Sequence, residues 1–324
     1  MPDIKILNKK EFPDDKNGTQ FYVQKASIFD YISQYYKDYG VTNTAVNNML
    51  KYGFLRDHCE TIKNKIYVLN TQIDNIFSTN IISLDTNDFF KSLVFGIKML
   101  EKVENFHPRF GTFFDKIAKR NGTALNYLER HMVGKLGETG TVKYINNLLK
   151  QSGSKLEVEN SFDTTQVESA DIVFVRNSKS KVLVNAGKRI QIKCSAGLNG
   201  VILKEDKYKL DGETFNVDYC AFAQLLNSPF VFIIDYLTKL AHKFFDGIGS
   251  DEILANVAKE IDKDLLKTTV KLCGYIARSK MKIIEKGETL APLGEVSSDS
   301  YYAYVADLET DYSTLAKELV SVNT

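Results

Sequence analysis

Four polar residues between positions 138 and 193 have the types and spacing that phosphodiester hydrolysis can use. Asp171 begins an apolar run, and Gln191 and Lys193 flank one apolar residue in a later run. Because side chains alternate along a strand, Gln191 and Lys193 are expected on the same face. A carboxylate and an amide carbonyl suit a hard divalent cation, and a lysine beside them can orient a water or neutralise a phosphate. Glu138, further upstream, is a second carboxylate for such a site.

A helix and a strand meander are needed to bring these side chains together. Glu138 is expected to begin a helix, on the face that carries apolar residues at 142, 145 and 149. After a polar turn the pattern changes to that of strands. Four strands are expected, at 156–158, 171–175, 181–184 and 189–194. A hairpin between the second and the fourth would place Asp171 beside Gln191 and Lys193.

Two of the polar residues have more than one interpretation. Glu138 lies on an apolar helix face, and burying an unpaired charge costs several kcal/mol. It therefore lies at the rim, binds a cation, or begins the helix as an anion that the helix dipole favours. Ser195 is expected on the same strand face as Lys193, where it can touch a phosphate or simply end the strand.

The order of these residues resembles the PD-(D/E)xK nuclease superfamily, in particular its Mrr-like, Holliday-resolvase and restriction-endonuclease branches. In that family a helix with a glutamate precedes a sheet that carries Asp and (Asp/Glu/Gln)-x-Lys. Glu138, Asp171, Gln191 and Lys193 match these positions, and the resemblance covers residues 134–197. One departure is Gln191, which replaces the usual acid and removes one negative charge. The other is the long gap between Asp171 and Gln191, which needs an extra hairpin arm.

The resemblance implies a metal-dependent mechanism. Asp171 and Gln191 would hold Mg²⁺, or Mn²⁺ in its place, and Glu138 would contact the metal through water. The metal would polarise the phosphate and lower the pKa of an attacking water. Lys193 would orient that water or stabilise the pentavalent state.

The first seventy residues resemble a winged helix-turn-helix. Helices are expected at 27–36 and 42–52, and a two-stranded ribbon at 54–56 and 65–69. The second helix would be the recognition helix, with short polar side chains and one cation directed outward. Its candidate DNA contacts are Asn43, Thr44, Asn47, Asn48 and Lys51. The alternative is a small packing or protein-contact domain.

The composition limits the classes of protein to which this chain can belong. The chain has 324 residues, a hydrophobic share of 44% and a net charge of +1, which excludes a polycation that binds nucleic acid indiscriminately. No apolar run is long enough for a membrane span, and no secretory signal is recognised. The four cysteines form no CxxC pair and are expected to be reduced thiols in the cytoplasm.

The C-terminal half is expected to add helices. An apolar and aromatic run at 218–245 predicts helices that cover the sheet, and 250–284 predicts one or two more. The segment 259–286 has a net charge of +4, so it either faces a phosphate backbone or forms a solvated helix face. The segment 287–324 has a net charge of −6, and it includes Tyr301, Tyr302 and Tyr304, which suit an interface or an ordered tail.

These observations predict an α/β fold: a mixed β-sheet, nuclease-like core flanked by helices, with a mainly helical N-terminal domain. The expected units are the winged helix-turn-helix at 1–75, a helical connector at 76–133, the nuclease core at 134–286 and an acidic tail at 287–324. The expected function is a Mg²⁺-dependent restriction endonuclease acting on double-stranded DNA, compatible with a homodimer. Two alternatives stay open: a non-catalytic nucleic-acid-associated or virion structural protein, and a branched-DNA or RNA nuclease.

Overall fold

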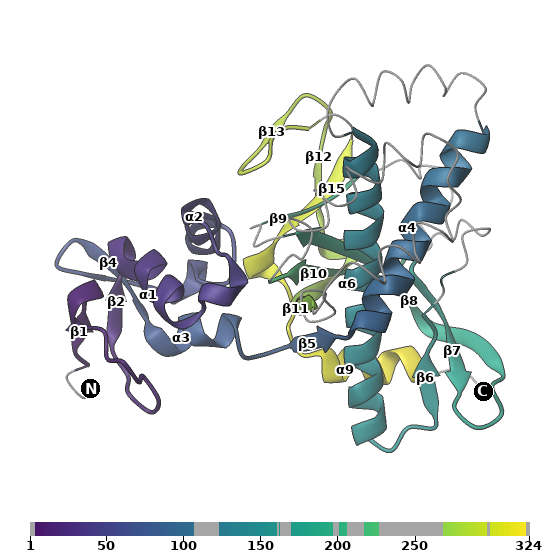
Figure 1. Ribbon diagram of the computed structural model, residues 1–324, viewed down its shortest axis with the longest axis horizontal. Helices are drawn as coiled ribbons and strands as arrows, with labels where there is room; N and C mark the ends of the chain where they lie inside the picture. Colours follow the sequence, from purple (N-terminus) through teal and green to yellow (C-terminus); the bar gives the residue numbers. More distant parts are fainter. Residues whose placement is uncertain are drawn as a thin grey trace.

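The computed structural model describes residues 4–106, 123–160, 162, 170–196, 201–205, 217–226, 268–296 and 299–321. In this part the chain forms an N-terminal unit of short helices around a small sheet, joined to a larger part in which helices cover a mixed sheet (Figure 1). The expectation of an α/β fold is confirmed at this level.

The N-terminal unit packs three short helices against a sheet. The helices are α1 (Ile28–Tyr35), α2 (Asn43–Lys51) and α3 (Asn70–Ile76). The strands, in the order β1-β2-β4-β3 among the described residues, are β1 (Ile6–Leu7), β2 (Tyr22–Gln24), β3 (Cys59–Ile62) and β4 (Lys65–Leu69). Buried aromatic and aliphatic side chains, such as Phe21, Tyr31 and Met49, join the helices to the sheet.

The ribbon of this unit differs from the expected one. The partner of β4 is β3, not residues 54–56, and the two strands pair antiparallel from Cys59 with Val68 to Ile62 with Lys65. Lys63 and Asn64 between them have positive φ angles of 47° and 62°, the backbone of a tight two-residue hairpin turn. Leu55 is instead fully buried beneath the helices, which explains why the expected strand does not form.

The larger sheet is mixed. Its order in the described residues is β5-β11-β10-β8-β7-β6. The strands are β5 (Ile81–Leu84), β6 (Leu156–Val158), β7 (Ile172–Asn177), β8 (Leu183–Ala196), β10 (Tyr219–Leu225) and β11 (Thr268–Ala277). β6, β7 and β8 form the expected antiparallel meander, and β10 then runs parallel to β8. β5 extends this sheet from within the segment expected to be a helical connector.

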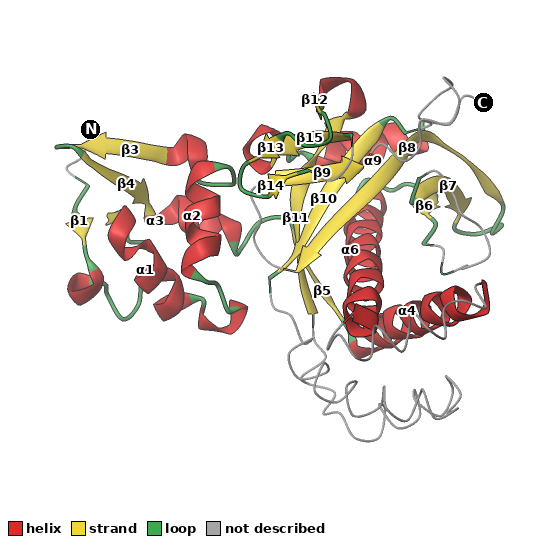
Figure 2. Ribbon diagram, turned by 90° about the horizontal axis from the view of Figure 1, so that it is seen from above, coloured by secondary structure: helices red, strands yellow, loops and turns green. Residues whose placement is uncertain are grey.

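Among the described residues, three helices share one core with this sheet: α4 (Thr86–Phe106), α6 (Thr123–Gln151) and α9 (Tyr312–Val320). The opposite face is covered by a smaller sheet of the described residues, in the order β12-β15-β9, with bounds Lys282–Ile284, Ser300–Tyr304 and Val201–Glu205. Figure 2 shows α4 and α6 on one side of β10 and β11, and β9 and β15 on the other. A short hairpin of β13 (Thr289–Leu290) and β14 (Gly294–Glu295) lies beyond β12.

Several sequence-based expectations for secondary structure are wrong. Residues 219–225, 268–277 and 282–284 form strands, not helices, and residues 227–245 and 250–267 of those expected helices lie outside the described residues. The strands expected at 181–184 and 189–194 are one continuous strand, β8, which forms a long hairpin arm with β7. The described residues of the acidic segment are folded, since they supply β13, β14, β15 and α9.

His107 lies outside the described residues, and His131 is half-buried on α6, where burial lowers its pKa. In the part of the chain that the structure describes, no helix combines the length and the hydropathy needed to cross a bilayer.

The side chain of Lys271 on β11 connects the two parts of the molecule. It is 4% exposed, and its Nζ donates to the carbonyl oxygen of Thr79 at 2.7 Å and, at 3.3 Å each, to the Asn75 carbonyl and Thr79 Oγ1. Asn75 belongs to the last turn of α3, where carbonyl oxygens favour a cation. Lys271 therefore attaches the N-terminal unit to the large sheet.

From the burial of Lys271 we predict a specific pH dependence of the free energy of unfolding. Burial lowers its pKa from 10.5 to about 8. Between these values the unfolded chain keeps a proton that the folded chain has released, so the free energy of unfolding should rise with pH over this interval. The rise should be at most on the order of 3 kcal/mol. Other groups also titrate in this range, so the measurement is a comparison: in urea unfolding, the free energy of unfolding of the wild type relative to Lys271→Met should rise with pH between these values.

The control for this measurement is Lys282→Met, because Lys282 is exposed on β12. That variant should keep the wild-type pH dependence. An identical pH slope in Lys271→Met and the wild type would show that Lys271 is not the titrating group.

Candidate active site

Asp171 and Gln191 lie side by side in the structure. Asp171 directly precedes β7, and its backbone nitrogen donates to the carbonyl oxygen of Ile190 on β8 at 2.9 Å. Its Oδ2 accepts a hydrogen bond from Nε2 of Gln191 and a second from the backbone nitrogen of Ile192 at 2.6 Å. The meander thus brings together the two residues that the sequence placed twenty positions apart.

Lys193 follows on the same strand. Strand alternation directs its side chain to the same face as Gln191, and it is half-buried, opposite Phe222 in the register with β10. Its ammonium forms no hydrogen bond or ion pair with any residue that the structure describes. A half-buried cation of this kind is available for an anionic ligand.

The thiol next to Lys193 is not a candidate nucleophile. Cys194 points to the opposite face, towards α6, and burial raises its pKa to about 12. The thiol is therefore protonated at neutral pH, and a protonated thiol is a poor nucleophile. The four cysteines are all free, as expected from the sequence.

Glu138 does not begin a helix, which corrects the sequence-based expectation. It lies in the middle of α6, and its Oε1 forms an ion pair at 2.6 Å with Nζ of Lys135, one turn earlier. Lys135 is 4% exposed and lies about 5 Å from the ring centroids of Phe95 and Phe162. The half-buried carboxylate is thus compensated by a buried lysine, a partner that the sequence-based prediction did not identify although it stands three residues away.

The position of Glu138 relative to β8 follows from its neighbour, Gly137. An added Cβ at Gly137 would overlap the side chain of Cys194 on β8. Glu138 and Lys193 are each adjacent in sequence to this contact, so the backbones of α6 and β8 approach each other there, while the side chain of Lys193 points to the face away from α6. The structure brings Asp171 and Gln191 into direct contact, while Glu138 is hydrogen-bonded to Lys135.

The donor set fits a hard divalent cation that keeps much of its water shell. Asp171 offers a carboxylate, and rotation of the Gln191 amide by half a turn would present its carbonyl oxygen in place of Nε2. No group of three or more His, Cys, Asp or Glu side chains gathers at a metal-binding spacing in the described residues. Magnesium is often held by only one or two carboxylates together with water and substrate phosphate.

The second candidate region is the outer face of α2. Thr42 caps this helix, since its Oγ1 accepts from the backbone nitrogen of Ala45 at 3.2 Å. Val46, Met49 and Leu50 are buried against the N-terminal core. The opposite face is polar: Asn43, Thr44, Asn47 and Lys51 are exposed, and Asn48 is half-buried.

Comparisons with known proteins identified no relative of this chain. No protein-family model matches the chain, and neither a curated protein nor a solved structure matches it. We therefore infer the function from the geometry and chemistry of the described residues.

Proposed function

We propose that this chain is a Mg²⁺-dependent DNA endonuclease of the restriction type, with a nuclease-like sheet as its core. The observation that carries the proposal is the direct contact of Asp171 and Gln191. Lys193 follows on the same strand face, without a partner among the described residues. A helix followed by an antiparallel meander positions these groups, as the resemblance to the PD-(D/E)xK nucleases implies.

In this proposal the residues have separate roles. Asp171 and the carbonyl oxygen of Gln191 hold Mg²⁺, which when bound supplies charge stabilisation for the phosphate and lowers the pKa of a water. Lys193 stabilises the negative charge that develops on the phosphate or orients the attacking water. Glu138 can contribute a carboxylate at the rim only when it exchanges its ion pair with Lys135.

The proposal is tested by incubating the purified protein with plasmid and phage DNA in Mg²⁺, Mn²⁺ or EDTA. Cleavage that depends on the metal supports it. Because Asp171 is the one acid placed to bind the metal in this proposal, cleavage should need a higher Mg²⁺ concentration than it would at a site with two acids. Gln191→Glu adds a second acid, so the Mg²⁺ concentration that gives half-maximal cleavage should be lower in this variant than in the wild type. Binding without cleavage under every condition would refute it.

A non-catalytic role is the second candidate, and one observation favours it. The only carboxylates matched to the motif are Asp171, which is hydrogen-bonded to Gln191, and Glu138, which is paired with Lys135. A nucleic-acid-associated or virion structural protein with a nuclease-like sheet would bind DNA and show no turnover. The remaining alternative is a nuclease for branched DNA or RNA. Cleavage of those substrates, and not of plasmid or phage DNA, in the same assay would identify it.

DNA binding by α2 makes a further prediction. Lys51 is the exposed cation of the polar face, so Lys51→Ala should weaken DNA binding to a similar extent for all sequences. The slope of log K against log salt should fall in magnitude by about 0.9, the loss of one phosphate contact. Fluorescence anisotropy at several salt concentrations measures both quantities.

The matched control is Lys150→Ala, at the exposed end of α6, which should leave the slope unchanged. A wild-type protein whose affinity is insensitive to salt would instead indicate that this face contacts protein.

A further inference from the structure

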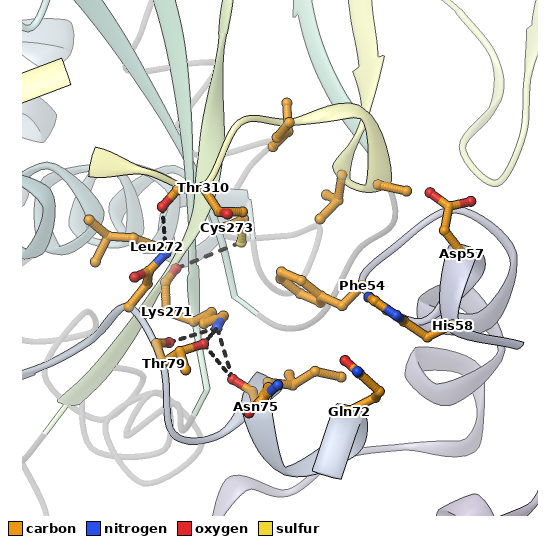
Figure 3. Close-up of a pocket in the computed structure, with 15 residues that line it drawn as sticks. Phe54, Asp57, His58, Gln72, Asn75, Thr79, Lys271, Leu272, Cys273 and Thr310 are labelled. Carbon is orange, nitrogen blue, oxygen red and sulfur yellow. Dashed lines mark hydrogen bonds between the residues drawn. The ribbon is translucent and has the colours of Figure 1, made fainter. Parts of the chain in front are cut away.

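A cavity of about 410 Å³ lies between the N-terminal unit and the large sheet. On one side it is lined by α3 and by the turn after α2, and on the other by β11 and by the segment after β15. Figure 3 shows Lys271 from β11 hydrogen-bonded to Asn75 and Thr79 in the cavity wall, with Phe54, His58 and Gln72 further along it. Cavities of about 300–1,000 Å³ are typical of small-molecule sites.

The charge balance of this cavity favours an anion. Lys271 is almost completely buried, yet its three acceptors are neutral oxygens, and no carboxylate of the described residues lies within ion-pair distance. Asp57 also lines the cavity, but Arg56 binds its carboxylate at 3.0 and 3.1 Å. A buried cation without a counter-charge is costly, and an anionic ligand would supply that charge.

The hydrogen bonds of Lys271 leave room for such a ligand. Two of the three are 3.3 Å long, beyond the usual range for an N–H donor, so a phosphate oxygen can replace them with shorter, charge-assisted bonds. The side chains of Gln72 and His58 form no hydrogen bond with the described residues, so their polar groups are available to a ligand.

The remaining wall suits a flat ring. The ring of Phe54 lies 5.3 Å from Nζ of Lys271, measured to the ring centroid. Ile76, Val305 and Leu308 add apolar surface beside it. A ligand that has an anionic group and an attached aromatic ring can therefore contact both parts of the wall at once.

We propose that this cavity binds a nucleoside phosphate, with the phosphate on Lys271, the base against Phe54 and polar base atoms on Gln72. The proposal is independent of nuclease activity, because none of these residues belongs to the candidate active site. Binding would place a ligand between the two parts of the molecule that Lys271 already connects.

The test is isothermal titration of the full chain with AMP, GMP, CMP and UMP in turn. Adenosine, inorganic phosphate and a short single-stranded oligonucleotide are the comparison probes. We expect at least one nucleotide to bind, and adenosine and phosphate to bind at least about tenfold more weakly, since each lacks one of the two contacts. Equal affinity for inorganic phosphate, or binding of the oligonucleotide alone, would overturn the assignment to a nucleoside phosphate.

Substitutions of the lining residues test whether the ligand binds in this cavity. Lys271→Met should raise the Kd of the bound nucleotide roughly tenfold or more, because it removes a charge-assisted hydrogen bond. Gln72→Glu and Gln72→Lys form a matched pair at a half-buried position that makes no hydrogen bond, so both should fold. The first should weaken binding and the second strengthen it.

The variants also separate this site from a purely structural role of Lys271. If Lys271→Met does not fold, the opposite effects of the two Gln72 variants still test the proposal. Unchanged affinity in both Gln72 variants, or absence of binding by all four nucleotides at millimolar concentration, would show that Lys271 serves only to attach α3 to the sheet.

Discussion

Replacing Lys193 with alanine is expected to lower Mg²⁺-dependent DNA cleavage by at least about 100-fold, the usual effect of removing one charge-stabilising donor from an active site. The reason is positional: Lys193 is two residues from Gln191 on one strand face, and its ammonium has no partner among the described residues. Since the ammonium forms no hydrogen bond or ion pair with the described residues, its removal should change the free energy of unfolding only a little. Gel assays of plasmid cleavage and thermal unfolding of the same preparation measure both quantities.

The control is Lys179→Ala, in the exposed turn of the β7–β8 hairpin, which should retain full cleavage. Asp171→Asn is the companion variant. Its side chain keeps one oxygen that can accept from the backbone nitrogen of Ile192, so the hairpin should fold while the anionic ligand is lost. Cleavage that survives in both Lys193→Ala and Asp171→Asn would remove the catalytic role from this site.

The local geometry of the candidate site was predictable because it depends on short-range periodicity. Alternation along β8 places Gln191 and Lys193 on one face, and the antiparallel hairpin returns Asp171 to Gln191. Helices α1 and α2 were predictable for a similar reason, since each has a clear apolar stripe and is followed by a turn or a glycine, whereas α3 was not among the expected helices.

The central strands were not predictable by the same means. β10 is buried along Cys220–Leu225, so its side chains show no alternation between apolar and polar. A short apolar run of this kind is equally compatible with a buried helix. Most of β11 is buried as well, and its sequence includes Lys271, whose polar partners lie about 190 positions away. Only the tertiary structure identifies such a residue as a junction.

The start of α6 was misplaced because of its glycines. Gly134, Gly137 and Gly140 lower the intrinsic helix propensity of this stretch, so the sequence favours a helix that begins after them. The structure shows why two of them are needed: an added Cβ at Gly137 would overlap Cys194, and one at Gly140 would lie 2.9 Å from Cβ of Val270. Close packing of the helix on β8 and β11 therefore outweighs propensity.

This packing makes Gly137→Ala the most destabilising small substitution that we expect. The added methyl group has no free space between α6 and Cys194, so the helix must move away from β8 or Cys194 must shift. Overpacking of this kind costs about 3 kcal/mol. Because Glu138 and Lys193 are adjacent to the contact, cleavage should also fall, even where the variant remains folded. Urea unfolding and the plasmid assay measure the two effects.

Gly134→Ala is the matched control on the same helix. Gly134 is exposed, and an added Cβ there meets no atom within 4 Å, so the same change should stabilise the protein by about 0.5–1 kcal/mol through helix propensity alone. The two substitutions are identical and lie one helical turn apart, so opposite changes in the free energy of unfolding would distinguish the effect of packing from that of helix propensity. Adding Cys194→Gly to Gly137→Ala removes the overlapping atoms and should recover part of the lost stability, as a non-additive pair in contact does. Recovery of cleavage together with stability would show that the distance between α6 and β8 controls the geometry of the candidate active site.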